Sequence, residues 1–500
     1  MALVPSRPSR RIFHLGLLAA LLGGPGTSGA STAGTPGIAG SSPPNATQAL
    51  ERGLPGDGAL RDSKASLSRT EQTTGRVDEA ARSRNASESP PLASPESSRL
   101  REGTPESVGM SAERLARIDT LCEEAIRDGR IPGAVALVAR RGTLVHLKAY
   151  GMADTTAGRP MTTDAIFRIA SQTKAITATL VMMLWEEGRF GLDEPIARWI
   201  PEFKDPGVLT AFDEANVTWT TEPARRPITI RHLLTHTSGI GYGAIDRDPR
   251  FRKIYEKHGL INLFADTPTT IGERIKRLAR MPLHHHPGEK FTYSEGLDVL
   301  GYFAELVAGE SLDVLLRERL FEPLGMADTA LFLPEHKAGR LVALQHREGG
   351  AWTPYPRTFY DPDYPIKGAR SFFSGGAGLS STAYDYATFL QMYLNGGELN
   401  GIRFLSRTTI DTIMREQDGG TWGGAEKHHG LAFAVVSDPG VAKGGLGSAG
   451  TFEWGGYFNT QYFADPTEGI IGILLKQTQG DSGDDTGERF RRLVHAAIDD

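Results

Sequence analysis

Two residues three positions apart, Ser171 and Lys174, are the strongest chemical signal in the chain. They stand in the run FRIASQTK at residues 167–174. If Ser171 begins a helix, Lys174 lies one turn later on the same face. A serine hydroxyl becomes a strong nucleophile only when a nearby group takes its proton, and a lysine can do so when its surroundings favour the neutral amine. On spacing alone, an N-cap serine with an exposed lysine is the more ordinary interpretation.

The elements around this pair predict an α+β fold. Strand-like runs stand at residues 134–140 and 143–150, and again at 431–436, 452–454, 461–464 and 470–477. The middle is mostly helical. Apolar spacing predicts a helix after the serine and a closing one, through Ile176, Leu180, Met183 and Leu184 and through Phe490, Leu493, Val494 and Ala497. We therefore expect one antiparallel sheet formed by both termini of the folded region, flanked by helices, with a mostly helical second lobe.

Four segments in this order resemble the serine β-lactamase and penicillin-binding superfamily. They are SQTK (171–174), HLLTHTSGI (232–240), YSEGLDVLG (293–301) and SGGAGLSST (374–382). The first is similar to the family's Ser-x-x-Lys motif and the third to its Tyr-Ser-x motif. Residues 106–500 are most similar to the class C branch and to the carboxylesterases within it. The resemblance implies the β-lactamase/transpeptidase-like form of the α+β fold.

The same resemblance implies a role for each matching position. Ser171 would be the nucleophile that forms an acyl-enzyme, and Lys174 would assist its deprotonation. Tyr293 would carry protons between the serine and the leaving group. Which of Lys174 and Tyr293 is the base for acylation stays open, since their titrations can be coupled. The backbone amides of Ser171 and Tyr457 would form the oxyanion hole.

The second motif departs from the family at Glu295, where an Asn is common. A carboxylate only accepts hydrogen bonds, whereas an amide both donates and accepts. We expect Glu295 at the substrate-binding position, in a form unsuited to recognition of a β-lactam side chain.

The third motif of lactamases, Lys-Thr-Gly or His-Thr-Gly, does not occur in the sequence. Two segments compete for its place: KGG at residues 443–445, which keeps the charge, and Trp454-Gly455-Gly456, which precedes strand-like sequence. We favour the second, so that Trp454, Gly455 and Gly456 would bind substrate. An indole in place of a cation removes the anchor for a substrate carboxylate and suits an uncharged ester.

The first hundred residues differ in composition from the rest. Arg7, Arg10 and Arg11 precede an apolar stretch at 12–22, and small residues follow at 28–30, as in a secretory signal peptide. Arg10 and Arg11 also resemble the twin-arginine export signal. We therefore predict a signal peptide at 1–30, a disordered Ser/Pro/Gly-rich tether at 31–105, and a hydrolase domain at 106–500. The predicted location is periplasmic or secreted.

Composition and charge exclude several other classes of protein and of binding site. The 500-residue chain has one cysteine and a net charge of −5. One thiol makes neither an intrachain disulfide nor a thiolate cluster, and the charge predicts no nucleic-acid surface. The histidine run 284–286 is interpreted as a loop, because adjacent histidines do not converge on one ion in regular structure. We expect no metal, no cofactor, and no membrane segment beyond the signal peptide.

These observations predict an exported serine hydrolase that cleaves small carboxylic esters through a Ser171 acyl-enzyme. One alternative is a β-lactamase or D-alanyl peptidase acting on cell-wall-like amides, against which the missing Lys-Thr-Gly argues. Another is a catalytically silent binding or scaffold protein of the same fold. The intact set of Ser171, Lys174 and Tyr293 argues against this second alternative.

Overall fold

The computed structural model describes residues 100–261, 264, 269–480 and 483–500. The predicted signal peptide and almost all of the predicted tether lie outside these residues. Within them, β1 (Arg101–Glu102) pairs in parallel with the start of β3 (Thr143–Asp154). The last residues assigned to the tether therefore belong to the sheet, because the Arg101 N–H donates to Gly142 O at 3.0 Å.

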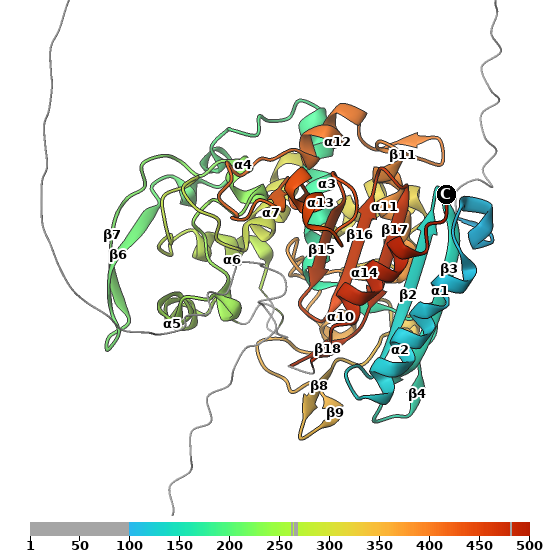
Figure 1. Ribbon diagram of the computed structural model, residues 1–500. Coiled ribbons are helices and arrows are strands. Elements are labelled where there is room, and N and C mark those ends of the chain that lie inside the picture. The colour runs from blue at the N-terminus through green and yellow to red at the C-terminus, as the bar shows by residue number, and fades with distance from the viewer. Residues whose placement is uncertain (1–99, 262–263, 265–268, 481–482) are drawn as a thin grey trace, which may run out of the picture. The chain divides into compact units, whose positions relative to one another are not determined.

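The main sheet combines strands from both ends of the folded region, as predicted (Figure 1). Among the described residues it has nine strands in the order β1-β3-β2-β17-β16-β15-β14-β13, with β4 on β3. At its centre β2 (Gly133–Arg140) pairs antiparallel with β17 (Ile470–Leu475). The remaining strands are β16 (Thr460–Asp465), β15 (Phe452–Gly456), β14 (Ala434–Val436), β13 (Lys427–His429) and β4 (Arg159–Pro160).

Strands β2 and β3 form the predicted hairpin at Arg141-Gly142. Both turn residues have positive φ, 50° and 76°, as a type I′ turn requires. All eight residues of β2 are buried, because helices cover both faces of the sheet. Successive side chains alternate between two cores: Val135, Leu137 and Ala139 in one, Ala134, Ala136 and Val138 in the other.

The helices on the smaller core come from the two ends of the folded region. Ser111 accepts a hydrogen bond from Arg114 N and caps α1 (Ala112–Leu115), which leads into α2 (Arg117–Arg127). The predicted closing helix is α14 (Thr486–Ala496), which lies beside α2 (Figure 1). On the opposite face, Thr382 caps α11 (Ala383–Leu394), which packs on β2 and β17.

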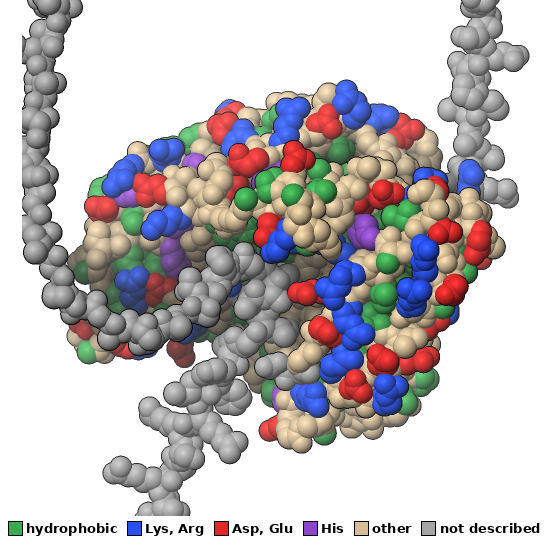
Figure 2. Space-filling view, viewed as in Figure 1, with side chains coloured by type: hydrophobic (Ala, Val, Ile, Leu, Met, Phe, Trp, Pro, Cys, Tyr) green, Lys and Arg blue, Asp and Glu red, His purple; other side chains and the backbone are tan. Residues whose placement is uncertain are grey.

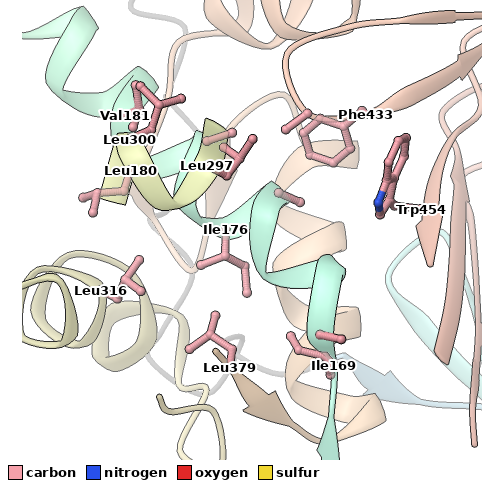
Figure 3. Packing of buried hydrophobic residues seen from close by; sticks show 14 of the residues in the cluster. Ile169, Ile176, Leu180, Val181, Leu297, Leu300, Leu316, Leu379, Phe433 and Trp454 are labelled. Atoms are coloured by element: carbon pink, nitrogen blue, oxygen red, sulfur yellow. The ribbon is translucent and has the colours of Figure 1, made fainter. Parts of the chain in front are cut away.

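The second lobe packs around α3 (Thr173–Glu186), which is buried along most of its length. Figure 3 shows Ile176, Leu180 and Val181 of α3 among apolar side chains of α7 (Gly296–Ala308) and neighbouring segments. The other helices are α4 (Ile230–Leu234), α5 (Pro249–Lys257), α6 (Ile271–Leu278), α8 (Leu312–Leu316), α9 (Glu322–Leu324), α10 (Tyr364–Lys367), α12 (Arg407–Met414) and α13 (Asp438–Lys443).

Small β elements interrupt the predicted helical middle. Strand β6 (Gly207–Asp213) pairs with β7 (Thr218–Pro223), a hairpin visible at the edge of Figure 1. The other short strands are β5 (Phe167–Arg168) with β10 (Ser380–Ser381), β8 (Gln345–Glu348) with β9 (Ala351–Pro354) and β18 (Thr478–Gln479), and β11 (Glu398–Leu399) with β12 (Ile402–Arg403). These pairings join segments without long periodic runs, so sequence periodicity did not show them.

Two predicted strands are shorter in the structure. Of residues 431–436 only Ala434–Val436 form β14, because Ala432 has φ 68° and Gly430 N turns back to Phe433 O. Residues 470–477 end their pairing with β2 at Leu475. The chain then leaves the sheet, and Thr478 pairs with Gln345 of β8 instead.

Charged side chains of both signs alternate over the face drawn in Figure 2. Several form surface ion pairs, such as Arg130 with Asp485 at 2.6 Å and Lys148 with Asp119 at 2.6 Å. Within the described ranges, no helix has both the length and the apolar character needed to cross a membrane.

Candidate active site

Ser171 lies in a tight turn immediately before α3. Residues Ala170–Gln172 form a 3₁₀ turn, and the α-helix begins at Thr173. Ser171 thus precedes the helix that it was expected to begin, and Lys174 is the second residue of α3. Ala170 has φ 44°, a left-handed value that is unfavourable for a side-chain-bearing residue. Such backbone strain is concentrated at functional sites, and here it directly precedes the serine.

The structure brings together the three residues of the predicted catalytic group. Tyr293 lies just before α7, and its hydroxyl is 2.7 Å from Ser171 Oγ. Lys174 Nζ is 3.4 Å from the same oxygen. Ser171 is 8% exposed and Lys174 only 1%. A nearly buried serine hydroxyl therefore contacts two groups that can exchange protons with it.

Neutral oxygens and aromatic rings surround the Lys174 side chain. Its Nζ donates to Gly376 O at 2.8 Å and contacts Tyr242 Oη at 3.2 Å. It also lies over the rings of Tyr242 and Tyr293, 5.0 and 4.8 Å from their centroids. None of the ion pairs among the described residues includes Lys174. The amine is therefore buried without a carboxylate in contact.

Tyr242 is a member of this group that sequence reasoning missed. Its ring stacks on Tyr293 with centroids 5.2 Å apart, and burial raises its pKa well above the usual value. It stands three residues after Gly239, in the loop that follows α4. The segment resembling HLLTHTSG was the available signal, but it ends before this residue. Without contacts, one tyrosine in a loop is indistinguishable from any other.

Strand β15 brings Trp454, Gly455 and Gly456 alongside the Ser171 turn. A Cβ on Gly456 would lie 2.4 Å from Ile169 O, so only glycine permits this approach. The Trp454 ring lies 6.1 Å from the Tyr293 ring. The competing lysine, Lys443, ends α13 and pairs with Glu426 at the surface.

Tyr457 directly follows β15 and lies among aromatic side chains. Its ring contacts Phe359 and Phe458, with centroids 5.7 and 5.2 Å apart. Phe458 in turn contacts Tyr355 and Tyr360, two residues of the stretch 354–373, which is rich in aromatic residues. This stretch therefore forms an apolar surface next to the end of β15.

Glu295 is not placed to bind a substrate. Its side chain has no exposed surface, and both carboxylate oxygens contact Arg274 of α6 at 2.8 Å. Burial raises the pKa of Glu295 to about 7, and the Arg274 guanidinium opposes this rise. The expectation of a substrate-binding residue at this position is therefore wrong. The carboxylate turns away into a buried ion pair that fixes the start of α7.

His236 holds the segment that carries Tyr293. Its Nδ1 accepts the Ser294 N–H at 3.2 Å and lies 2.9 Å from Ser294 Oγ. Its ring contacts the Tyr293 ring at 4.7 Å, and burial lowers its pKa well below the usual value. The imidazole is therefore neutral and positions the tyrosine. The three histidines 284–286 bind Asp246, Thr292 and Glu222 separately.

Comparison with known proteins identifies the family. The Beta-lactamase family profile matches residues 118–497. The chain belongs to the beta-lactamase family. Its sequence aligns with esterase EstB of Burkholderia gladioli at 34% identity over 399 residues. The alignment covers 75% of this chain and 93% of EstB. The chain is 29% identical over 409 residues to lovastatin esterase of Penicillium rubens, covering 76% and 98%.

A solved structure agrees with this assignment. EstCE1, described as a hydrolase with promiscuous acyltransferase activity, matches with a TM-score of 0.65 and 27% identity, covering 78% of this chain and 99% of its own. The resemblance noted in the sequence and the predicted fold class are confirmed. The protein is a serine hydrolase of the β-lactamase fold, of the esterase-like kind.

Proposed function

We propose that the protein hydrolyses small, uncharged carboxylic esters, with Ser171 as the nucleophile. One observation carries the proposal: Ser171 Oγ contacts both Tyr293 Oη and Lys174 Nζ, and both Ser171 and Lys174 are buried. Trp454, rather than a cation, faces this group from β15. An ester without a carboxylate anchor suits such surroundings better than a penicillin does. The names of EstB and lovastatin esterase support the same substrate class.

In the proposed acylation, Ser171 Oγ forms a bond to the ester carbonyl carbon while its proton passes to Lys174 or Tyr293. The carbonyl electron pair moves onto oxygen, and the amides of Ser171 and Tyr457 stabilise that oxyanion. Its collapse breaks the bond to the alcohol, which leaves with a proton returned through Tyr293. Water then attacks the acyl-enzyme by the reverse route, which divides one difficult displacement into two easier ones.

A direct comparison of two chromogenic substrates tests this proposal. Purified residues 100–500 are assayed with 4-nitrophenyl butyrate and with a chromogenic cephalosporin, alongside Ser171→Ala. We expect ester turnover and fluorophosphonate labelling, both abolished by Ser171→Ala. Cephalosporin turnover without ester turnover would instead indicate a β-lactamase or D-alanyl peptidase. A folded wild type that neither turns over nor labels would indicate a silent scaffold.

We also propose that the protein is exported to the periplasm or secreted. The support is the order of charged, apolar and small residues in the first thirty positions and the pair Arg10-Arg11. Fractionation of cells that express the full chain tests this. Replacing Arg10 and Arg11 with lysine should retain the protein in the cytoplasm if the twin-arginine route is used, and unchanged export would exclude that route.

A further inference from the structure

A continuous chain of hydrogen bonds leads from Lys174 to the buried carboxylate of Asp298, a residue of the segment 293–301 to which the motif assigns no role. Lys174 Nζ donates to Gly376 O at 2.8 Å. The same peptide group donates from Ala377 N to Ser374 Oγ at 3.1 Å. The Ser374 hydroxyl then donates to Asp298 Oδ1 at 2.5 Å. Three hydrogen bonds and one peptide group thus connect the amine to Asp298 of α7.

Every donor in this chain points toward the carboxylate. Ser374 and Asp298 are each 1% exposed, so the chain runs through the protein interior. Aligned hydrogen bonds polarise one another, and the effect is strongest where the surroundings have a low dielectric constant. A negative charge at Asp298 therefore makes Gly376 O a better acceptor for the hydrogen bond from Lys174 Nζ.

The backbone around Gly376 is shaped to make this connection. Asp298 Oδ1 also accepts the Gly376 N–H at 3.1 Å. A Cβ on Gly376 would lie 2.2 Å from Asp298 Oδ2, and one on Gly375 would lie 2.6 Å from Leu297 O. The two glycines thus allow the segment to lie directly on α7, so the carboxylate fixes the position of the carbonyl.

We propose that Asp298 is a positioning residue that acts through Ser374 and the 376–377 peptide group on Lys174. It sets the pH at which the Ser171–Lys174–Tyr293 group gives up a proton and becomes active. This inference rests on the proposed ester hydrolysis. The inference goes beyond that function because it assigns a role to Asp298, which contacts neither the substrate nor the nucleophile.

Other charged or titratable groups also face Lys174. They are the phenols of Tyr242 and Tyr293, the His236 imidazole, and the Glu295–Arg274 pair from α6 and the start of α7. Burial keeps His236 neutral by lowering its pKa. Burial raises the pKa of Glu295 to about 7, Arg274 at contact distance opposes this rise, and the Asp298 charge adds to it. Asp298, by contrast, is connected to Lys174 by the chain of hydrogen bonds described above.

The decisive experiment is the pH profile of kcat/KM for 4-nitrophenyl butyrate in Asp298→Asn. The amide keeps an acceptor for Ser374 but removes the charge. Loss of a proton from the catalytic group then becomes easier, whether Lys174 or Tyr293 gives it up. We expect the acidic limb to move to lower pH by about one unit, the size expected for a buried charge at an effective dielectric constant near 20. An unmoved limb in the folded variant would overturn the proposal.

Asp385→Asn is a matched control. Asp385 is 6% exposed and accepts from a hydroxyl, Thr329 Oγ1 at 2.9 Å, and from a backbone amide, Asp328 N at 2.8 Å. It therefore resembles Asp298 in burial and partners but lies at the start of α11. We expect its acidic limb to match that of the wild type. A shift equal to that of Asp298→Asn would show that any buried carboxylate has this effect and would overturn the proposal.

Ser374→Ala gives a second route to the same answer. This substitution keeps the Asp298 charge but removes the hydroxyl that links it to the 376–377 peptide group. The acidic limb of the kcat/KM profile should therefore move to lower pH, by less than in Asp298→Asn. If Asp298→Asn does not fold, an unmoved limb in Ser374→Ala overturns the proposal by itself. The pH dependence of fluorophosphonate labelling separates the two proposals. An unlabelled wild type contradicts ester hydrolysis, whereas a labelled wild type with unmoved limbs contradicts only the role of Asp298.

Discussion

The protein contains two buried lysines that differ in their partners. Lys174 is 1% exposed and contacts neutral oxygens. Lys476, at 0% exposure, follows β17 and binds the Asp484 carboxylate at 2.5 Å. A carboxylate partner offsets the charge of a buried ammonium, whereas neutral acceptors offer it hydrogen bonds without a countercharge. The comparison indicates that the charge of the partner, and not burial alone, distinguishes a lysine that can take part in catalysis from one that stabilises the fold.

The substitution Lys174→Met should have the largest effect of those that test the difference between the two lysines. Methionine keeps the length of the buried side chain, so the fold should survive, but it does not exchange a proton with Ser171. We expect kcat/KM for 4-nitrophenyl butyrate to fall about 10³-fold, the range for loss of an acid–base group. Thermal unfolding is measured alongside the kinetics. Retained turnover in the folded variant would remove the lysine from the mechanism.

Lys476→Met should produce the opposite pattern. It leaves Asp484 buried and unpaired, which typically costs about 3 kcal/mol of unfolding free energy or more. The remaining folded protein should hydrolyse the ester at the rate of the wild type. Urea titration measures the loss of stability, and the double variant Lys476→Met/Asp484→Asn should recover part of it. A variant that is stable but inactive would mean that the two lysines do not differ as described.

Lowering the pH should weaken the Lys476–Asp484 ion pair and reduce the free energy of unfolding. The expected loss is smaller than that caused by Lys476→Met. Burial opposes ionisation, but the Lys476 ammonium overcomes it and lowers the pKa of Asp484 to about 2. Because the unfolded value is higher, the stabilisation is complete above about pH 4 and is lost as the pH falls toward 2. It amounts to about 2 kcal/mol. Urea unfolding at pH 5 and pH 3 should show a smaller pH dependence in Asp484→Asn than in the wild type, and equal dependence would contradict the assignment.

The fold was predictable where the chain carries regular patterns. Alternating apolar residues and turn residues located β2, β3, β16 and β17 to within a few positions. The apolar face after Ser171 located α3. The hairpin β6–β7 was missed although a short turn joins its strands, because most of its residues are not buried and no alternating apolar pattern marks them. The short strand β18 was missed because its partner, β8, is distant in sequence. Such pairing leaves no local signal.

The site was predictable where short motifs specify it. Ser171, Lys174 and Tyr293 come together as the Ser-x-x-Lys and Tyr-Ser-x segments predicted. Glu295 was misplaced, because a motif position says nothing about the direction of a side chain, and Arg274 of α6 binds this one. Tyr242 and Asp298 went unnoticed for the same reason. Their roles depend on contacts across many residues, which one sequence does not reveal.

The pairing of β2 with β17 also determines when the enzyme can form during its synthesis. Arg140 pairs with Ile470 and Val135 with Leu475, so the centre of the sheet waits for the last strands to leave the ribosome. At common translation rates this interval is roughly 15 to 60 seconds. Throughout it, the apolar strand β2 and helix α3 lack their final cover and are open to aggregation. Ser171 therefore meets β15 (Phe452–Gly456) only when the chain is almost fully synthesised.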